Sequence, residues 1–144
     1  MKRKASARIA TLLKLAALRE QNAARAFASS NAKLEQARQQ ADQLENYGRE
    51  YEQAFRTIDT PLSASQLLNF HGFFGQLSAI QTQQEQTVQQ RSTEQEAARQ
   101  RWLEAYTRIQ LLERIRQQRL AREQLEQEKR LQRELDDRPR FNSE

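Results

Sequence analysis

Several residue types on which active sites and compact cores depend are nearly absent from this chain. Its 144 residues include no cysteine, one histidine, two prolines and three glycines. Without cysteine there is no disulfide, thiolate metal site or thiol redox chemistry, which suits a reducing compartment. Only 37% of the residues are apolar and 30% are charged, so we do not expect a multilayered core.

Enzyme motifs are also missing. The sequence contains no GxxxxGK[ST] phosphate loop, no GxSxG elbow and no HExxH zinc motif. His71 has no other candidate ligand or catalytic partner beside it, and the carboxylates are scattered among arginines and lysines. We therefore expect a protein that is not an enzyme, with no catalytic residue, no metal site and no cofactor.

Long apolar runs are the third absence. No segment approaches the roughly 20 apolar residues that cross a bilayer. The basic and then apolar start resembles a signal peptide superficially, but Lys14 interrupts the apolar run and no convincing cleavage site follows. We expect a cytoplasmic protein.

The residues that are abundant are those of long helices: alanine, glutamine, glutamate, arginine and leucine. Over about residues 5–58, apolar residues recur with the alternating four- and three-residue spacing of a coiled-coil seam. A helix with one apolar stripe requires a partner, because the stripe otherwise stays in water. The seam positions are Ile9, Leu13, Ala16, Glu20, Ala23, Phe27, Ser30, Leu34, Ala37, Ala41, Leu44, Gly48, Tyr51, Phe55 and Ile58.

A turn is expected at about residues 59–62, where Pro61 disfavours helical geometry for the residue before it. Ser63 and Gln66 then have the spacing of a capping box that starts a helix over about 63–137. Its seam is polar in the middle. The positions are Leu67, Phe70, Phe74, Leu77, Gln81, Gln84, Val88, Arg91, Gln95, Ala98, Trp102, Ala105, Ile109 and Leu112.

These patterns predict an all-α fold: two long helices in an antiparallel coiled-coil hairpin, the second longer and overhanging. We expect one domain over residues 1–144, with a tail over 138–144. Positions equally far from the turn should lie side by side, so Phe74 should face Gly48. By the same count, Trp102 should lie beside Glu20–Ala24.

Pairing should end where both seams fade, near residue 113. Beyond about Arg116, strong helix formers continue with only a thin series of leucines. We expect this segment to overhang and to fray when it is free. A solvated helical tail and a partner-binding segment both remain open.

Two short stretches near the turn carry more aromatic residues than a two-helix coil buries. Tyr47 and Phe73 fall beside the seam, and the hairpin would bring them together. One interpretation is that they cover the flank of the coil. The other is a protein-docking patch, since exposed aromatic clusters often mark interfaces.

The net charge of +5 is concentrated at the start, where residues 1–25 carry seven lysines and arginines and one glutamate. This basic run should lie beside Arg101, Arg108, Arg114, Arg116 and Arg119. A solvated face, an acidic protein partner and anionic lipid all remain open. Nucleic acid is the weakest alternative, because no aromatic residue interleaves the basic ones.

Taken together, several elements resemble the flagellar FliJ family, the coiled-coil stalk proteins of the flagellar type III export apparatus. The likeness covers essentially the whole chain. It lies in a YxxEY element (Tyr47, Glu50, Tyr51), in the Leu62–Gln66 stretch after the turn, in an FxxQLxxAI-like segment (Phe73 or Phe74, Gln76, Leu77, Ile80) and in Trp102 of a basic second helix.

The resemblance implies a non-enzymatic stalk or adaptor of flagellar protein export, similar to the stalk subunit of rotary ATPases. The paired termini would enter the hexameric export ATPase, and an aromatic-bearing face would contact the export-gate membrane protein and export chaperones. These partners would recruit the protein to the cytoplasmic face of the inner membrane at the flagellar base. Export-gate binding maps onto Gln40, Leu44, Tyr47, Tyr51, Phe73 and Leu77, and ATPase binding is assigned to Arg8, Leu13, Arg114 and Arg119.

Two alternatives stay open beside this hypothesis. The sequence separates poorly a flagellar stalk from the equivalent stalk of a virulence type III secretion system. A basic coiled-coil binder of nucleic acid or anionic membrane is the alternative from another class, although no nucleic acid is expected.

Overall fold

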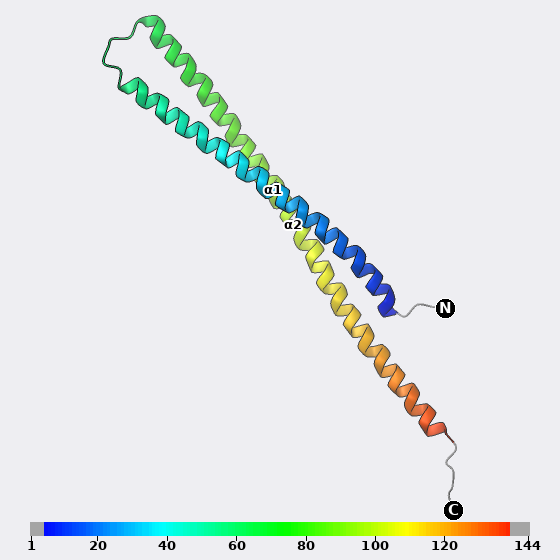
Figure 1. Cartoon of the computed structure of the whole chain (residues 1–144). Helices are drawn as coiled ribbons and strands as arrows, with labels where there is room; N and C mark the ends of the chain where they lie inside the picture. The colour runs from blue at the N-terminus through cyan, green and yellow to red at the C-terminus, as the bar shows by residue number, and fades with distance from the viewer. Residues whose placement is uncertain (1–4, 139–144) are drawn as a thin grey trace, which may run out of the picture. The chain divides into compact units, whose positions relative to one another are not determined.

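The structure, a computed structural model, describes residues 5–138 and consists there of two helices (Figure 1). Helix α1 spans Ala5–Arg56 and has 52 residues, and α2 spans Ala64–Asp137 and has 74. No strand occurs in this part of the chain. The predicted all-α fold of two antiparallel helices, the second longer, is confirmed. The expected tail lies, from residue 139 onward, outside the described residues.

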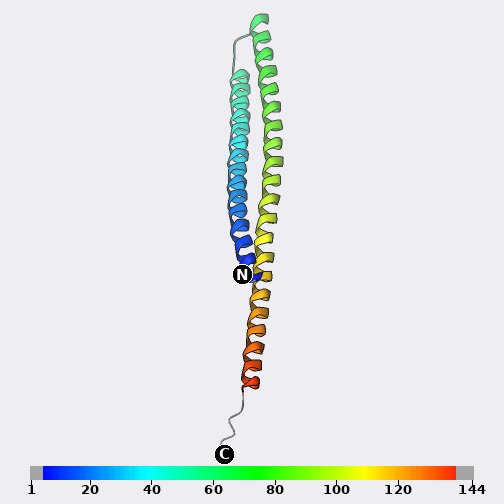
Figure 2. The same ribbon diagram turned by 90° about the vertical axis from the view of Figure 1, so that its right-hand side faces the viewer.

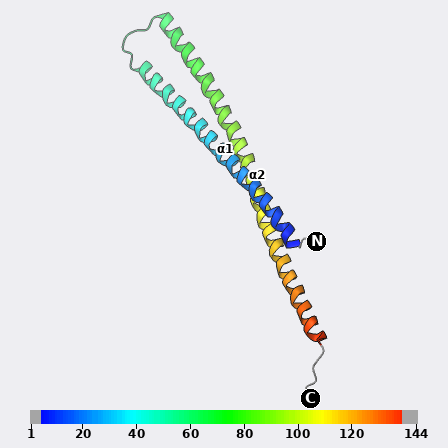
Figure 3. The ribbon, with the colours of Figure 1, turned by 45° about the vertical axis from the view of Figure 1, so that its right-hand side comes forward.

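The chain divides into two compact units. Unit 1 comprises Met1–Asn22 and Leu103–Glu144, and unit 2 comprises Ala23–Trp102. Each unit pairs a segment of α1 with an antiparallel segment of α2. Figure 3 shows the turn of unit 2, where the cyan end of α1 connects to the green start of α2.

The turn begins two residues earlier than the sequence pattern suggests, because α1 ends at Arg56. The start of α2 is fixed by the predicted capping box. The backbone N–H of Gln66 donates to Oγ of Ser63 at 3.2 Å, and the N–H of Ser63 donates to Oε1 of Gln66 at 3.0 Å. These two bonds satisfy donors that the first turn of a helix otherwise leaves free.

The register of unit 2 differs from the expected one by about one helical turn. A Cβ atom on Gly48 would lie 3.3 Å from Leu77 and 2.9 Å from Nε2 of Gln81, so Leu77, and not Phe74, faces this glycine. Trp102 stacks on Phe27, with ring centroids 6.0 Å apart, one turn beyond the expected Glu20–Ala24. The seam spacing determines which face of each helix is buried, but it does not determine how far one helix is shifted along its axis relative to the other.

In unit 1 the helices pair further than expected. Ser6, at the start of α1, is hydrogen-bonded to Glu123 of α2, about three turns beyond the predicted end of pairing near residue 113. Figure 2 shows the dark-blue first turns of α1 beside α2, and the red end of α2 continuing past them. The predicted overhang of α2 is present, but it begins beyond Glu123 and not at about Arg116. The reason is that polar contacts continue the seam after its apolar residues end.

The buried residues are few and mostly small. Within residues 5–138 they are Ser6, Ala16, Leu34, Ala37, Leu77 and Ala98. Five of them occupy seam positions, and Ser6 lies one seam interval, three residues, before the first seam position. Alanine brings helices close together but buries little area per residue. Helix pairing in this chain therefore depends on a small number of larger contacts, described next.

Candidate protein-docking sites

Near the turn, five rings from α1 and α2 pack into one aromatic cluster: Tyr51, Phe55, Phe70, Phe73 and Phe74. Tyr51 is at its centre, with ring centroids 4.0 Å from Phe73, 5.4 Å from Phe74 and 5.6 Å from Phe70. Phe55 closes the cluster against Phe70 at 4.7 Å. All five side chains are half-buried, so the cluster joins the helices and also reaches the surface.

Tyr47 extends this cluster onto the surface. Its ring packs edge-on against Phe73 at 6.2 Å, and 51% of the residue is exposed. Phe73 was expected to lie outward on the flank, but it is half-buried, as Phe74 is. The two phenylalanines differ in their neighbours, because only Phe73 contacts Tyr47.

Gln40, Leu44 and Tyr47 line one open hollow of about 440 Å³, together with Gln43 and Gln84. Within this lining, Nε2 of Gln84 donates to the carbonyl of Ala37 at 2.9 Å and to Oε1 of Gln40 at 3.3 Å. This hollow and the exposed edge of Tyr47 form a continuous surface beside the aromatic cluster.

Leu77 is only 7% exposed. It packs against Gly48 in the seam and lies beneath the surface. The structure therefore brings five of the six residues mapped to export-gate binding onto or beside one surface, and places the sixth underneath as support.

A second hollow, of about 740 Å³, opens beside Gly48 and Phe74. Two ion pairs within α1 border it: Arg49 with Glu45 at 2.5 Å, and Arg56 with Glu52 at 2.7 Å. His71 also lines it. Among the described residues, no group of three histidine, cysteine, aspartate or glutamate side chains could hold a metal ion.

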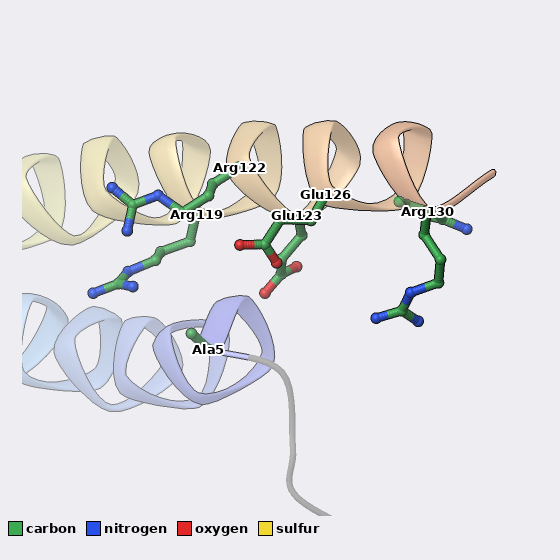
Figure 4. Close-up of a pocket in the computed structure, with 7 residues that line it drawn as sticks. Ala5, Arg119, Arg122, Glu123, Glu126 and Arg130 are labelled. Atoms are coloured by element: carbon green, nitrogen blue, oxygen red, sulfur yellow. The ribbon is translucent and has the colours of Figure 1, made fainter. Parts of the chain in front are cut away.

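The residues assigned to ATPase binding all lie in unit 1. Arg8, Arg114 and Arg119 are exposed, whereas Leu13 is half-buried in the seam. Arg119 lines a hollow of about 450 Å³ beside Ala5, the first described residue of α1. Figure 4 shows the side chains of Arg119, Glu123 and Arg130 on the side of α2 that faces α1.

Ser6 and Glu123 are a pair that the sequence pattern missed. Oγ of Ser6 donates to Oε2 of Glu123 at 2.7 Å, and the Ser6 backbone N–H donates to Oε1 at 3.3 Å. A carboxylate from α2 thus occupies the positive end of the α1 dipole, where it is favoured. The signal was present, since both residues fall on the continued seam spacing, but polar residues at seam positions do not show by themselves that two helices are paired.

The residues around Tyr47 and around Arg119 form exposed surfaces and open hollows within the described part of the chain. No helix among the described residues is long and apolar enough to span a bilayer.

Comparison with known proteins found no matching curated protein and no matching solved structure. The family model described as "Flagellar FliJ protein" matches residues 5–142, nearly the whole chain. The chain therefore belongs to the FliJ family of flagellar export stalk proteins.

Proposed function

We propose that this chain is a non-enzymatic stalk or adaptor of the flagellar type III export apparatus. In this function its helix ends enter the hexameric export ATPase, and its aromatic face contacts the export gate and export chaperones. The family match over residues 5–142 is the observation that supports this most. The protein would act in the cytoplasm and reach the inner membrane through these partners.

The gate contact is supported by the surface around Tyr47. A large aromatic side chain that is half exposed at the edge of a packed cluster is typical of an interface hot spot. The cluster beneath holds the ring in place, so little side-chain entropy is lost on binding. Gln40, Leu44, Tyr51 and Phe73 would surround this anchor.

Gate binding is tested with Tyr47→Ala, measured by calorimetry with the purified cytoplasmic domain of the gate protein. We expect at least a tenfold loss of affinity with unchanged helicity, because Tyr47 lies at the edge of the cluster. The matched control is Leu68→Ala, which removes an even more exposed side chain, 71% accessible, from the start of α2. Equal affinities of the two variants would contradict the proposal.

The ATPase contact is supported by the exposed arginines of unit 1. We expect the wild-type chain to stimulate hydrolysis by the cognate export ATPase and to promote its hexamer at low-micromolar concentration. Charge reversal at Arg8 and Arg119 should lower the stimulation and leave gate binding unchanged. A wild-type chain that neither stimulates hydrolysis nor promotes hexamers would remove the stalk function.

A further inference from the structure

Unit 1 carries a second apolar stripe that the helix pair does not cover. Leu12 and Leu15 lie on α1 outside the seam, and each is 46% exposed. Arg8 precedes them by four residues and Arg19 follows by four, so the spacing 4, 3, 4 repeats that of the seam. We call these four residues the leucine stripe. Two leucines with coiled-coil spacing on a second face are what a third helix requires.

The hollow beside Ala5 shows which α2 residues lie on the same side. Ala5 is three residues before Arg8 and so continues the leucine stripe, and the hollow it lines also includes Arg119 and Arg122. Ile115 is seven residues before Arg122 and Arg108 seven before that, so these residues share one face of α2. The leucine stripe is thus matched by arginines across the helix pair.

The charges of this face are not neutralised within the described chain. Arg8, Arg19, Arg119 and Arg122 make no ion pair among residues 5–138. Of the two glutamates that line the hollow, Glu123 is already bonded to Ser6. An occupant of the leucine stripe would therefore meet leucines along its centre and free guanidinium groups around them.

We propose that the leucine stripe docks an amphipathic helix of a partner protein, with leucine-like residues at seam spacing and acidic residues beside them. The incoming helix would form a third strand beside α1 and α2. Its apolar residues would cover Leu12 and Leu15, and its carboxylates would pair with the arginines at both ends of the stripe. This goes beyond the proposed function, because it does not depend on the export ATPase being the partner.

The chemistry favours a helix over a lipid surface. Stable interfacial binding needs a broad apolar face, whereas here two half-covered leucines are bracketed by arginines along the helix axis. From Arg8 to Arg19 the stripe is about three helical turns long, with positive charges at both ends. A partner helix can carry acidic residues at the same spacing, whereas a fluid layer of lipid headgroups has no fixed spacing of charges.

The probe is a synthetic peptide of about three heptads with leucine at the seam positions and glutamate on both flanks. Binding to the full chain is measured by fluorescence anisotropy at about 0.1 M salt, where exposed charges further apart than about 10 Å are screened. A second peptide with lysine in place of every glutamate is the matched probe. We expect only the glutamate peptide to bind.

Three variants identify the surface. L12S/L15S should weaken binding of the glutamate peptide at least tenfold, because it removes the apolar centre. Arg8→Glu with Arg19→Glu should abolish this binding and create binding of the lysine peptide. The matched control is Leu18→Ser, which changes a 59% exposed leucine outside the stripe and should bind as the wild type does. Circular dichroism verifies that each variant is helical.

Three results would overturn the proposal. One is that the glutamate peptide does not bind, and another is that L12S/L15S binds it unchanged. The third is that the wild-type chain floats with vesicles of anionic phospholipid, or self-associates in sedimentation, and that L12S/L15S does not. Loss of flotation would assign the stripe to lipid, and loss of self-association would assign it to a second copy of the chain. Stimulation of the export ATPase is measured separately. A wild-type chain that stimulates hydrolysis but does not bind the glutamate peptide would refute this inference and leave the proposed function standing.

Discussion

The two units join their helices with opposite chemistry. In unit 2, rings of α1 and α2 interlock around Tyr51 near the turn. In unit 1, at the start of α1, a serine and a glutamate form the contact, and arginines line the hollow beside it. Burial of rings stabilises strongly and is tolerant of small shifts, whereas hydrogen bonds stabilise little but demand one geometry. Apolar area thus holds the helices together near the turn, whereas polar geometry holds the start of α1 against α2.

The largest effect should come from Tyr51→Ala, which removes the central ring of the aromatic cluster in unit 2. Tyr51 contacts three phenylalanines, and its removal leaves a gap between the helices. Because the ring is half-buried, we expect the free energy of unfolding to fall by about 2–3 kcal/mol, below the range for a fully buried ring. Urea unfolding followed by circular dichroism measures this. Tyr47→Ala is the control, with an expected loss below about 1 kcal/mol.

A smaller and more local effect is expected from Glu123→Ala. It removes the acceptor of both Ser6 bonds, those donated by the backbone N–H and by the hydroxyl of Ser6. We expect a loss of about 1–2 kcal/mol, confined to the start of α1. Hydrogen exchange should become faster at residues 6–10 and stay unchanged near Tyr51. Glu126→Ala is the matched control, and equal acceleration in both variants would show that the Ser6 contact does not hold the end.

The sequence allows the helices and the capping box to be predicted, because each depends on local spacing. The contact between Tyr47 and Phe73 could also be expected, because both residues lie within a few turns of the bend. The register is not predictable in this way. A seam of alanines and glutamines offers several alignments that differ by a turn, and the choice depends on individual contacts such as Phe27 with Trp102. The end of pairing was missed for a related reason. Arg119 and Glu123 occupy seam positions, but as charged residues they look like a solvated face until Ser6 is seen beside them.

The middle of the unit 2 seam is polar, and its helices are joined there by hydrogen bonds, as they are at the start of α1 in unit 1. Gln84 donates to the carbonyl of Ala37 and to Gln40. Gln84→Leu should raise the free energy of unfolding by about 1 kcal/mol, because a seam leucine buries apolar area that the amide does not. The cost should be a less specific register, seen as doubled NMR signals near Ala37. A Gln84→Leu variant with the stability of the wild type and single NMR signals would mean that Gln84 does not fix the register of the helices.

The smallest effects separate two glycines of unit 2. A Cβ on Gly75 would meet nothing within 4 Å, so Gly75→Ala should stabilise the helix by about 1 kcal/mol through propensity alone. At Gly48 the same gain is opposed, because the Cβ would lie 2.9 Å from Nε2 of Gln81, which donates to the carbonyl of Leu44 at 3.2 Å. Gln81 must then turn away and lose that bond, so Gly48→Ala should change the free energy of unfolding by nearly zero. Thermal unfolding of the two variants measures the difference. Equal stabilisation would show that Gln81 moves aside without loss and that the polar contact, unlike the aromatic cluster, contributes nothing to the pairing of the helices.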